Sequence, residues 1–399
     1  MSIKINANEI SYYMLGIIIM FTFFPPLFLE KIPSYVIYGL ILKYIRFILC
    51  VWVIFCFFIK RRIFYGDYIK YAFFMCSWIE MSNIANGMGN NKMIAFFQFV
   101  SPAINILGMY YIVKKYTLND GLNVLLISGC IYSSFVCIAN FISQLILKDG
   151  LYHDYAESNQ AIYVCGNDNS FVFFYLFSAG CFVLYSLFCY EKVKTFALFY
   201  CVFLEISMLL ADSTTGVAIM LGLNLVIIFS CKELIYIIRR SSKLIMCIAI
   251  TLLVWILWFR GWDSDIIHYL VYEITNEDMN FTSRGILWAG AVNLIMSAPL
   301  LGYGTFDNKL VSDLFGTMKS AHNTYLQILL FGGAPALAFF LGLVVRFYRT
   351  MTVKIKTNFF LVVLVSLYLV TFIFEQNPFC LELYFFLSLG FVTHKYNLL

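Results

Sequence analysis

Long apolar segments recur along almost the whole chain, with short polar segments between them. Each is close to the roughly 20 residues with which an α-helix crosses a bilayer. The twelve segments cover residues 10–29, 35–59, 68–84, 93–113, 122–147, 171–190, 195–211, 214–231, 244–259, 323–345, 358–374 and 380–393. Hydrophobic residues make up 62% of the chain and charged residues 12%, against about 45–50% and 25% in soluble domains. The sequence therefore predicts an all-α, polytopic integral membrane protein with about 12 transmembrane helices.

The distribution of Lys and Arg predicts the orientation in the membrane. With the N-terminus in the cytoplasm, 18 of the 27 basic residues lie on the inner side and 7 on the outer side. The other two, Lys43 and Arg46, fall within the second apolar segment. Short cytoplasmic loops carry the excess of positive charge in membrane proteins. We therefore expect both termini to be cytoplasmic and residues 1–399 to form a single membrane domain.

Two predicted outer segments are long enough to carry function. The smaller covers about residues 148–170, and the large loop covers about residues 260–322, between the ninth and tenth apolar segments. The large loop contains a predicted interfacial helix that begins near Thr282 and Ser283 and ends at Pro299. Gly302-Tyr303-Gly304 follows as a tight turn, where the backbone could approach a ligand closely.

Several function classes are disfavoured by what the sequence lacks. No basic stripe accompanies stacking aromatic residues, which argues against nucleic-acid binding. No phosphate-binding glycine loop, nucleophile elbow or metal-ligand cluster is present, so we expect no metal and no cofactor. Most cysteines sit singly in apolar segments, where a thiol acts as a small hydrophobe. Cys165 and Cys380 are the pair that could form a disulfide on the outer side.

Two basic residues of the large outer loop are candidates for catalysis. Arg284 lies in the first turn of the predicted interfacial helix, and His322 opens the tenth apolar segment. A guanidinium is always charged and binds phosphate through two hydrogen bonds, whereas an imidazole exchanges a proton near neutral pH. Together they suit a diphosphate leaving group and a hydroxyl that must lose its proton. The structural alternatives are an arginine that meets lipid headgroups and a histidine that caps a helix.

Four short motifs in and after the large loop resemble a known family. They are Ser-Arg-Gly-Ile-Leu-Trp at 283–288, Ala-Pro-Leu-Leu-Gly-Tyr-Gly at 298–304, Ala-His-Asn-Thr-Tyr-Leu-Gln at 321–327 and Gly-Gly at 332–333. Their order, in the large loop and the helix after it, resembles the signature of the O-antigen ligase and polymerase family. The resemblance covers about 50 residues, and the predicted layout of spans around a late outer loop agrees with it.

The resemblance implies a membrane glycosyltransferase that takes glycans from polyprenyl diphosphate instead of nucleotide sugars. It matches Arg284 and His322 to the essential basic residues of the family. It also places Gly302, Tyr303, Gly304, Asn323 and Tyr325 among the expected substrate-binding residues. The implied partners are an undecaprenyl-diphosphate-linked glycan, as donor and as acceptor, the membrane lipid, and a polysaccharide chain-length regulator.

The chain departs from the family pattern at two places. The run 212–216 contains no arginine, although many members carry one there, and Ala336 stands where many ligases have a glycine. Lys43 and Arg46 could supply the missing charge, since residues three apart share a helix face. Two interpretations stay open for this pair. The side chains bind the substrate diphosphate, which we favour for Arg46, or they snorkel or pair with Glu80 or Glu205, which we favour for Lys43.

The predicted function is polymerisation of undecaprenyl-diphosphate-linked oligosaccharide repeat units at the outer leaflet of the bacterial inner membrane. The active site would face the periplasm, and glycosyl transfer would invert the anomeric centre. We prefer a polymerase because the chain is rich in residues with AT-rich codons, a bias typical of polysaccharide gene clusters. The alternatives are a ligase that transfers the glycan to lipid A core, and a glycolipid flippase or secondary transporter with about as many spans.

Overall fold

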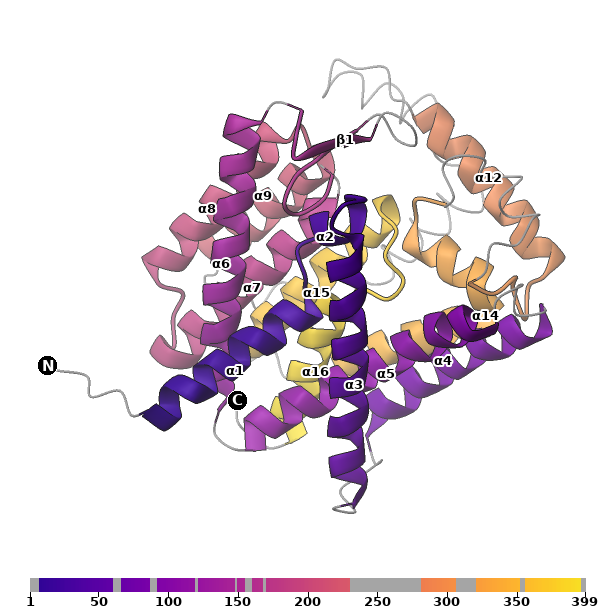
Figure 1. Ribbon diagram of the computed structural model, residues 1–399, viewed down its shortest axis with the longest axis horizontal. Coiled ribbons are helices and arrows are strands. Elements are labelled where there is room, and N and C mark those ends of the chain that lie inside the picture. The colour runs from indigo at the N-terminus through magenta and orange to yellow at the C-terminus, as the bar shows by residue number, and fades with distance from the viewer. Residues whose placement is uncertain are drawn as a thin grey trace, which may run out of the picture.

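The computed structural model shows an assembly of helices with one short hairpin (Figure 1). It describes residues 7–59, 66–86, 92–118, 121–147, 149–154, 160–167, 170–229, 281–305, 321–351 and 356–395. The helices are α1 (Ala7–Phe23), α2 (Phe28–Lys31), α3 (Val36–Ile59), α4 (Asp67–Ala85), α5 (Lys92–Leu118), α6 (Leu122–Ile146), α7 (Phe171–Tyr190), α8 (Thr195–Leu210), α9 (Thr214–Ile228), α12 (Phe281–Ser297), α14 (Thr324–Thr350), α15 (Lys356–Phe374) and α16 (Leu381–Lys395).

Ten of the twelve predicted apolar segments each coincide with one of these helices, the first is divided between α1 and α2, and the ninth lies outside the described residues. Five described helices are long and apolar enough to cross a membrane, namely α3, α6, α7, α14 and α15. The chain is therefore an all-α membrane protein in its main architecture. The count of about 12 spans, the inside and outside assignments and the extent of the large loop stay predictions.

The first apolar segment is not one continuous helix, contrary to the prediction for residues 10–29. Helix α1 ends at Phe23, and the short α2 begins only at Phe28. Pro25 and Pro26 lie between them, and a proline lacks the N–H that would extend the helix ladder.

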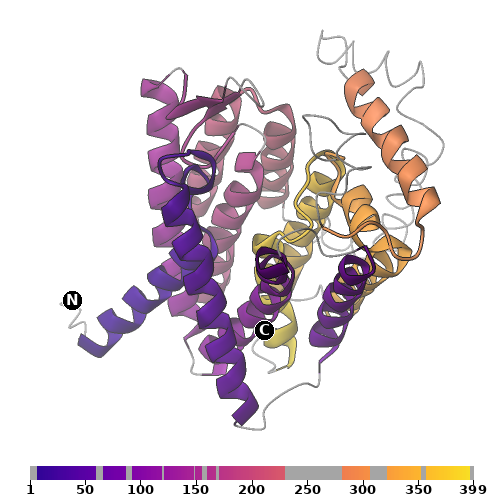
Figure 2. The ribbon, with the colours of Figure 1, turned by 45° about the vertical axis from the view of Figure 1, so that its right-hand side comes forward.

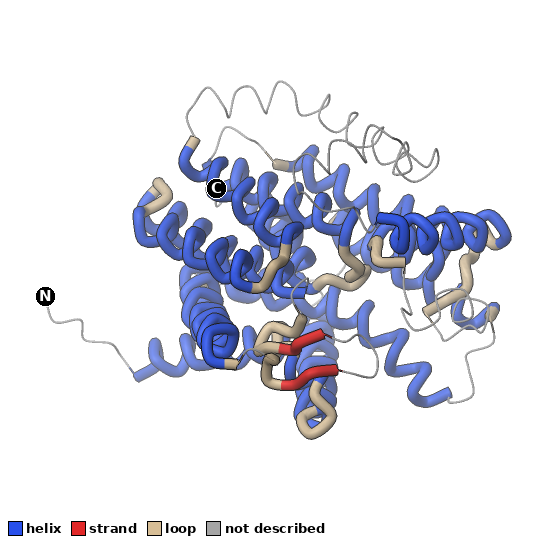
Figure 3. Tube along the Cα trace, turned by 90° about the horizontal axis from the view of Figure 1, so that it is seen from above, coloured by secondary structure: helices blue, strands red, loops and turns tan. Residues whose placement is uncertain are grey.

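The smaller outer segment contains the only strands in the described part of the chain, which the prediction of an all-α fold omitted. Strands β1 (Tyr152–Asp154) and β2 (Gln160–Ile162) pair antiparallel, with Tyr152 opposite Ile162. Figure 3 shows this hairpin at the periphery of the helices. Nearby, the Cys165 N–H donates to Asn140 Oδ1 of α6 (2.7 Å). Cys165 and Cys380 are both free and buried, so they form no disulfide.

The helices form two groups joined by the C-terminal pair (Figure 2). Helices α6, α7, α8 and α9 pack together in one group, and α4, α5, α12 and α14 lie in the other. Helix α15 contacts α7 and α9 of the first group and also α14, while α16 contacts α5 and α4. The Tyr368 hydroxyl of α15 donates to Phe173 O of α7 (2.9 Å), which ties the end of one helix to the start of the other.

Buried polar contacts join the helices of the first group. Asn140 of α6 donates to the Tyr175 hydroxyl of α7 (2.9 Å), and that hydroxyl shares a hydrogen bond with Ser207 of α8 (2.7 Å). Ser207 in turn donates to Gln144 Oε1 (2.6 Å). Lipid is as apolar as the side chains, so close packing and hydrogen bonds of this kind hold membrane helices together.

Helix α3 exposes apolar side chains over most of its surface. Ile48, Trp52 and Phe58 are 66%, 62% and 63% exposed. A soluble monomer rarely carries so large an apolar patch, whereas a helix in contact with lipid carries it without cost. The exposed face of α3 therefore fits a membrane-facing position.

Helix α14 is broken in its middle by a pair of glycines. Gly332 and Gly333 have non-helical dihedral angles, and Pro335 follows them without an N–H. The break leaves carbonyl and amide groups of α14 without partners inside the helix. An unpaired backbone group in a lipid environment costs several kcal/mol, so these groups need partners from elsewhere in the fold.

The segment after α12 supplies those partners. The Tyr303 N–H donates to Leu330 O (2.7 Å), and the Gly304 N–H donates to Phe331 O (3.0 Å). In the opposite direction, the Ala334 N–H donates to Pro299 O (2.7 Å). The backbone groups of residues 299–304 and those at the break in α14 therefore serve as hydrogen-bond partners for each other. We call this arrangement the glycine clamp.

Glycine is required on both sides of the glycine clamp. Gly302 and Gly333 have φ of +65° and +64°, a region that side chains with a Cβ rarely adopt. A Cβ on Gly302 would lie 2.5 Å from Leu330 O, and one on Gly333 would lie 2.5 Å from the Leu300 carbonyl. The two backbones can approach this closely only because neither position carries a side chain.

We predict that Gly333→Ala destabilises the protein. The backbone conformation alone costs about 1–3 kcal/mol for a residue with a Cβ, and the overlap with Leu300 adds to this cost. The measurement is the thermal unfolding midpoint of the purified full chain in detergent, which should fall by several degrees.

The matched control is Gly222→Ala in the interior of α9. A Cβ there meets only Leu367 Cδ2, at 3.8 Å. Alanine should be neutral or stabilise this helix by about 0.5–1 kcal/mol. An unchanged midpoint for Gly333→Ala would show that the glycine clamp tolerates a side chain.

Candidate functional site

His322 lies at the start of α14 in a strained backbone conformation. Its φ is +45°, in the left-handed region that residues with a Cβ adopt infrequently. Its neighbours Ala321 and Asn323 are fully buried, whereas His322 itself is half-buried. The chain therefore presents the imidazole between two residues that are locked into the protein. Strained positions of this kind concentrate at functional sites.

The residues after His322 fasten the start of α14 to the end of α15. Asn323 Oδ1 accepts the Leu326 N–H (3.0 Å) as an N-cap, and its Nδ2 donates to Ile373 O (2.8 Å). Thr324 Oγ1 donates to Glu375 O (2.8 Å) and accepts the Asn377 N–H (2.9 Å). These four bonds explain how the fold holds a strained residue in place.

Tyr325 was expected to bind substrate together with Asn323, and the structure gives both side chains partners within the protein. The Tyr325 hydroxyl donates to Leu369 O of α15 (2.7 Å), and its ring is buried. Both residues therefore hold α14 against α15 in this structure. Their predicted role in substrate binding stays untested.

Arg284 lies in the first turn of α12, and its side chain lies outside the described residues. The helix itself agrees with the predicted interfacial helix, since it runs from Phe281 to Ser297, shortly before Pro299. Thr282 and Ser283 fall inside the helix instead of capping it.

Trp288 links α12 to the residue before His322. Its ring is 1% exposed, and its Nε1–H donates to Ala321 O (2.9 Å). Arg284 stands four positions earlier, on the same face of α12 and about 6 Å along its axis. The fold therefore brings the helix that carries Arg284 to the backbone beside His322.

Apolar contacts hold α12 against the first half of α14. Leu287, Trp288 and Ile295 of α12 are buried in one cluster with Leu326 and Leu330 of α14. Figure 1 shows α12 lying over the end of α14 at the edge of the molecule. These contacts pack one face of α12 against a neighbouring helix.

Gly302, Tyr303 and Gly304 were expected to approach a ligand, and their nearest neighbours in the structure belong to α14 and α4. Gly302 meets the break of α14, and a Cβ on Gly304 would lie 2.3 Å from Asn83 Oδ1. The Tyr303 hydroxyl donates to Leu294 O (3.0 Å). In this structure the glycines serve the glycine clamp, and their contact with a substrate stays a prediction.

Helix α4 supports the same segment from the other side. Trp78 Nε1–H donates to Leu300 O (3.0 Å), and Asn86 Nδ2 donates to Gly302 O (3.2 Å). Asn83 Oδ1 accepts the Thr305 N–H (2.6 Å). The segment after α12 is thus held between α4 and α14.

Lys43 pairs with Glu30 of α2, with 2.9 Å between Nζ and Oε2. The expectation that Lys43 forms an ion pair is therefore confirmed, but its partner is Glu30 and not Glu80 or Glu205. Glu205 instead accepts a hydrogen bond from Asn224 Nδ2 (2.6 Å). Glu30 lies seven residues beyond the end of α1 and is much nearer to Lys43 in the chain than Glu80 or Glu205.

Arg46 caps the end of α1. Its Nη1 donates to Phe23 O (3.0 Å), one of the last carbonyls of α1, which have no partner within the helix. The Tyr132 hydroxyl donates to the next carbonyl, Phe24 O. No hydrogen bond or ion pair of the described residues joins Lys43 or Arg46 to α12 or α14. The structure therefore gives Arg46 a structural partner, while α12, the helix that contains Arg284, docks beside His322 through Trp288.

The run 212–216, which lacks the arginine of many family members, begins α9. Asp212 has a φ of +52° and is exposed, and Ser213 Oγ accepts the Gly216 N–H (3.3 Å) as an N-cap. This run therefore contributes a helix cap and no positive charge.

Two residues near His322 were missed as site residues in the sequence. Trp288 belongs to a quoted motif, but its contact with Ala321 depends on how α12 docks. Glu375 follows α15 and is 8% exposed, and its backbone carbonyl accepts the Thr324 hydroxyl. An acidic residue just past a predicted span was the available signal. Among the described residues, no three His, Cys, Asp or Glu side chains are grouped as metal ligands.

We predict that Asn323→Ala lowers stability as well as activity. The substitution removes an N-cap, worth about 0.5–2 kcal/mol, and leaves Ile373 O without its donor. The thermal unfolding midpoint of the purified chain should fall. A midpoint equal to that of the unmodified chain, with activity lost, would assign Asn323 to substrate binding instead.

We predict that Arg46→Gln is more destabilising than Lys43→Gln. Hydrogen bonds from charged donors contribute about 1.5–3 kcal/mol, whereas an exposed ion pair contributes about 0–1 kcal/mol; the Lys43 and Glu30 side chains are 43% and 24% exposed. Unfolding midpoints of the two variants provide the comparison. Equal midpoints would contradict the capping role of Arg46.

The comparisons with known proteins agree with this arrangement. Residues 197–341 match the family model described as O-antigen ligase. The matched region contains α8, α9, α12 and the first part of α14, and hence the four motifs, the glycine clamp and His322. Comparisons with curated proteins and with solved structures found no match. The match over residues 197–341 confirms that the chain resembles the O-antigen ligase and polymerase family.

Proposed function

We propose that the chain polymerises undecaprenyl-diphosphate-linked oligosaccharide repeat units at the outer leaflet of the bacterial inner membrane. The observation that carries this proposal is the docking of α12 beside His322. This docking brings the helix that contains Arg284 next to His322, which is half-buried and has a strained backbone. Both residues lie within the matched family region. An outer, periplasmic position of this site is part of the proposal and rests on the distribution of Lys and Arg.

The proposed reaction is a direct displacement at the anomeric carbon of the donor. The acceptor hydroxyl forms the new glycosidic bond, and the bond between the anomeric carbon and the diphosphate oxygen breaks. The diphosphate leaves with the electron pair, and His322 accepts the hydroxyl proton as general base. Because attack and departure occur on opposite faces, the anomeric configuration inverts.

Arg284 would stabilise the negative charge that develops on the leaving diphosphate. Preorganised donors aimed at developing charge usually supply the largest part of a rate enhancement. The start of α14 adds a helix N-terminus, which also favours anions. The polyprenyl tails would stay in the bilayer throughout, and a chain-length regulator is the expected protein partner.

A ligase that transfers glycan to lipid A core is the second candidate. The description of the matched family model favours it, because that model is named for the ligase. Ala336, at a position where many ligases have glycine, favours the polymerase. The two reactions share donor chemistry and differ only in the acceptor.

The test is complementation of a strain deleted for this gene by His322→Ala and by Arg284→Ala, with surface glycan resolved on a gel. Loss of a general base costs about 10²–10⁴-fold in rate, so the long-chain ladder should vanish and leave lipid A core with a single repeat unit. Arg284→Lys should restore little, because lysine cannot bind a phosphate through a planar fork.

The controls are His394→Ala and Arg349→Ala, which change exposed residues of α16 and α14 far from His322 in the chain. All variants must reach the membrane at the level of the unmodified chain. Loss of every repeat unit from the core, with lipid-linked polymer accumulating, would identify the ligase. A normal ladder in both site variants would overturn the catalytic assignment and favour a transporter.

A further inference from the structure

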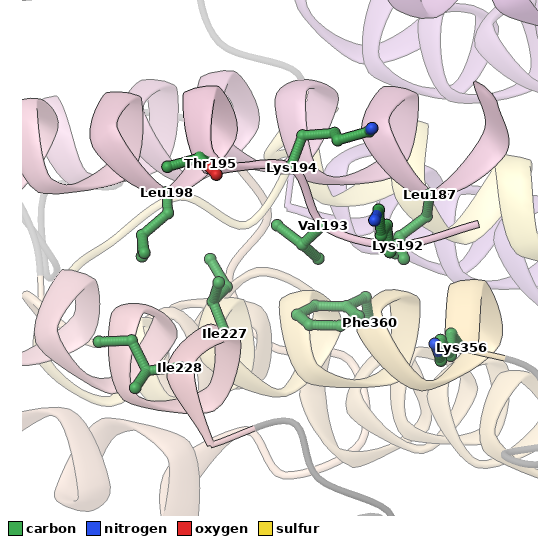
Figure 4. Close-up of a pocket in the computed structure, with 10 residues that line it drawn as sticks. All are labelled: Leu187, Lys192, Val193, Lys194, Thr195, Leu198, Ile227, Ile228, Lys356 and Phe360. Atoms are coloured by element: carbon green, nitrogen blue, oxygen red, sulfur yellow. The ribbon is translucent and has the colours of Figure 1, made fainter. Parts of the chain in front are cut away.

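Three lysines line a cavity at the far end of α7 from the β1–β2 hairpin; Figure 4 shows the lining residues. Helix α7 starts just after the hairpin and runs 20 residues to the cavity, a distance of about 30 Å. The cavity has a volume of about 390 Å³. It is formed where α7 and α9 end and where α8 and α15 begin, with the lining residues Leu187, Lys192, Val193, Lys194, Thr195, Leu198, Ile227, Ile228, Lys356 and Phe360.

The positive charge of the cavity comes from Lys192, Lys194 and Lys356. None of the three ammonium groups pairs with a carboxylate in the part of the chain that the structure describes. Glu191 in the same turn is exposed and offsets one charge. Two helices begin and two end here, so their dipoles largely cancel. The three lysines therefore make the cavity positively charged, with a net charge of about +2 once Glu191 is included.

The turn that carries two of these lysines is fixed from inside the protein. The fully buried Ser186 of α7 donates to Lys192 O (2.9 Å) and accepts the Lys194 N–H (2.6 Å). Lys194 Nζ also lies over the Tyr190 ring, 4.6 Å from its centroid. Lys192 and Lys194 are therefore presented on an ordered backbone and are not carried by a loose loop.

The walls of the cavity are apolar and continue onto an apolar outer surface. Figure 4 shows Leu198 and Ile227 facing each other across the space, with Phe360 beside them. Next to the cavity, Phe199, Ile228 and Phe229 are 69%, 58% and 58% exposed. A ligand that fits both features has an anionic head and apolar chains. Basic pockets between membrane helices on the cytoplasmic side bind the headgroups of acidic lipids in this way.

We propose that this cavity binds one acidic phospholipid of the cytoplasmic leaflet. Its phosphate groups would contact Lys192, Lys194 and Lys356, and its acyl chains would lie along the exposed faces of α8 and α9. The proposal does not depend on the glycan chemistry at His322, because the two sites lie at opposite ends of α15: Glu375, just past its last residue, meets Thr324, and Lys356 begins it. The lipid would brace the junction of four helices.

The test measures lipid binding by the purified, delipidated full chain, using native mass spectrometry and the thermal unfolding midpoint. Cardiolipin and phosphatidylglycerol are the acidic probes, with phosphatidylethanolamine as the zwitterionic one. We expect one retained acidic lipid and a midpoint raised by several degrees. Each lysine near a lipid headgroup contributes about fivefold in affinity, so Lys192→Gln/Lys194→Gln/Lys356→Gln should bind about a hundredfold more weakly.

The matched control removes three exposed basic residues elsewhere on the predicted inner side, as Lys70→Gln/Lys115→Gln/Arg349→Gln, and should bind lipid normally. The triple Lys→Arg variant at the cavity should keep its affinity, because it keeps the charge. Equal weakening by the control triple would show nonspecific attraction and overturn the proposal. Undiminished binding by the cavity Gln variant, equal binding of phosphatidylethanolamine, or equal stabilisation by inorganic phosphate alone would overturn it as well.

Discussion

The fold around the candidate site depends on one constraint, which is that backbone groups freed by the break in α14 must find partners in an apolar surrounding. Residues 299–304 provide those partners, with three reciprocal backbone hydrogen bonds to Leu330, Phe331 and Ala334. Gly332 and Gly333 are buried in the fold, and a buried backbone group without a partner is costly. Gly302 and Gly333 carry no side chain, so the two backbones can come within hydrogen-bonding distance. The two glycine motifs of the sequence therefore form a single structural unit, the glycine clamp.

The glycine clamp also sets the position of the proposed transfer site. Because residues 299–304 follow α12 directly, anchoring them to α14 brings α12 onto the same helix, where Trp288 contacts Ala321. The other side of His322 is tied to α15 through Asn323 and Thr324. The left-handed conformation of His322 costs free energy, and these flanking contacts offset that cost. Several motif residues therefore hold the scaffold of the proposed site, namely Trp288, Gly302, Asn323, Thr324 and Gly333.

The two ends of the molecule differ in chemistry. The end with α12 and His322 carries the proposed transfer site, and the opposite end carries the three unpaired lysines of the cavity. Helix α15 contacts α7, α9 and α14, and its first residue lines the cavity. Fastening both ends of this helix, by the caps near His322 and by a bound lipid, would resist relative motion of the two helix groups.

The sequence by itself determined the helical architecture and the identity of the two candidate catalytic residues. Apolar length and charge distribution are local signals, so every described apolar segment is helical, apart from the break at Pro25 and Pro26 in the first one. The ordered motifs pointed to Arg284 and His322. Only the tertiary structure decided what the other residues contact. Arg46 meets Phe23 O, Lys43 meets Glu30, and Asn323 and Tyr325 meet carbonyls of α15. A polar side chain in an apolar surrounding needs a nearby hydrogen-bonding or charged partner. Which partner is near depends on helix breaks, prolines and the docking of segments far apart in the chain, and these are not local properties of the sequence.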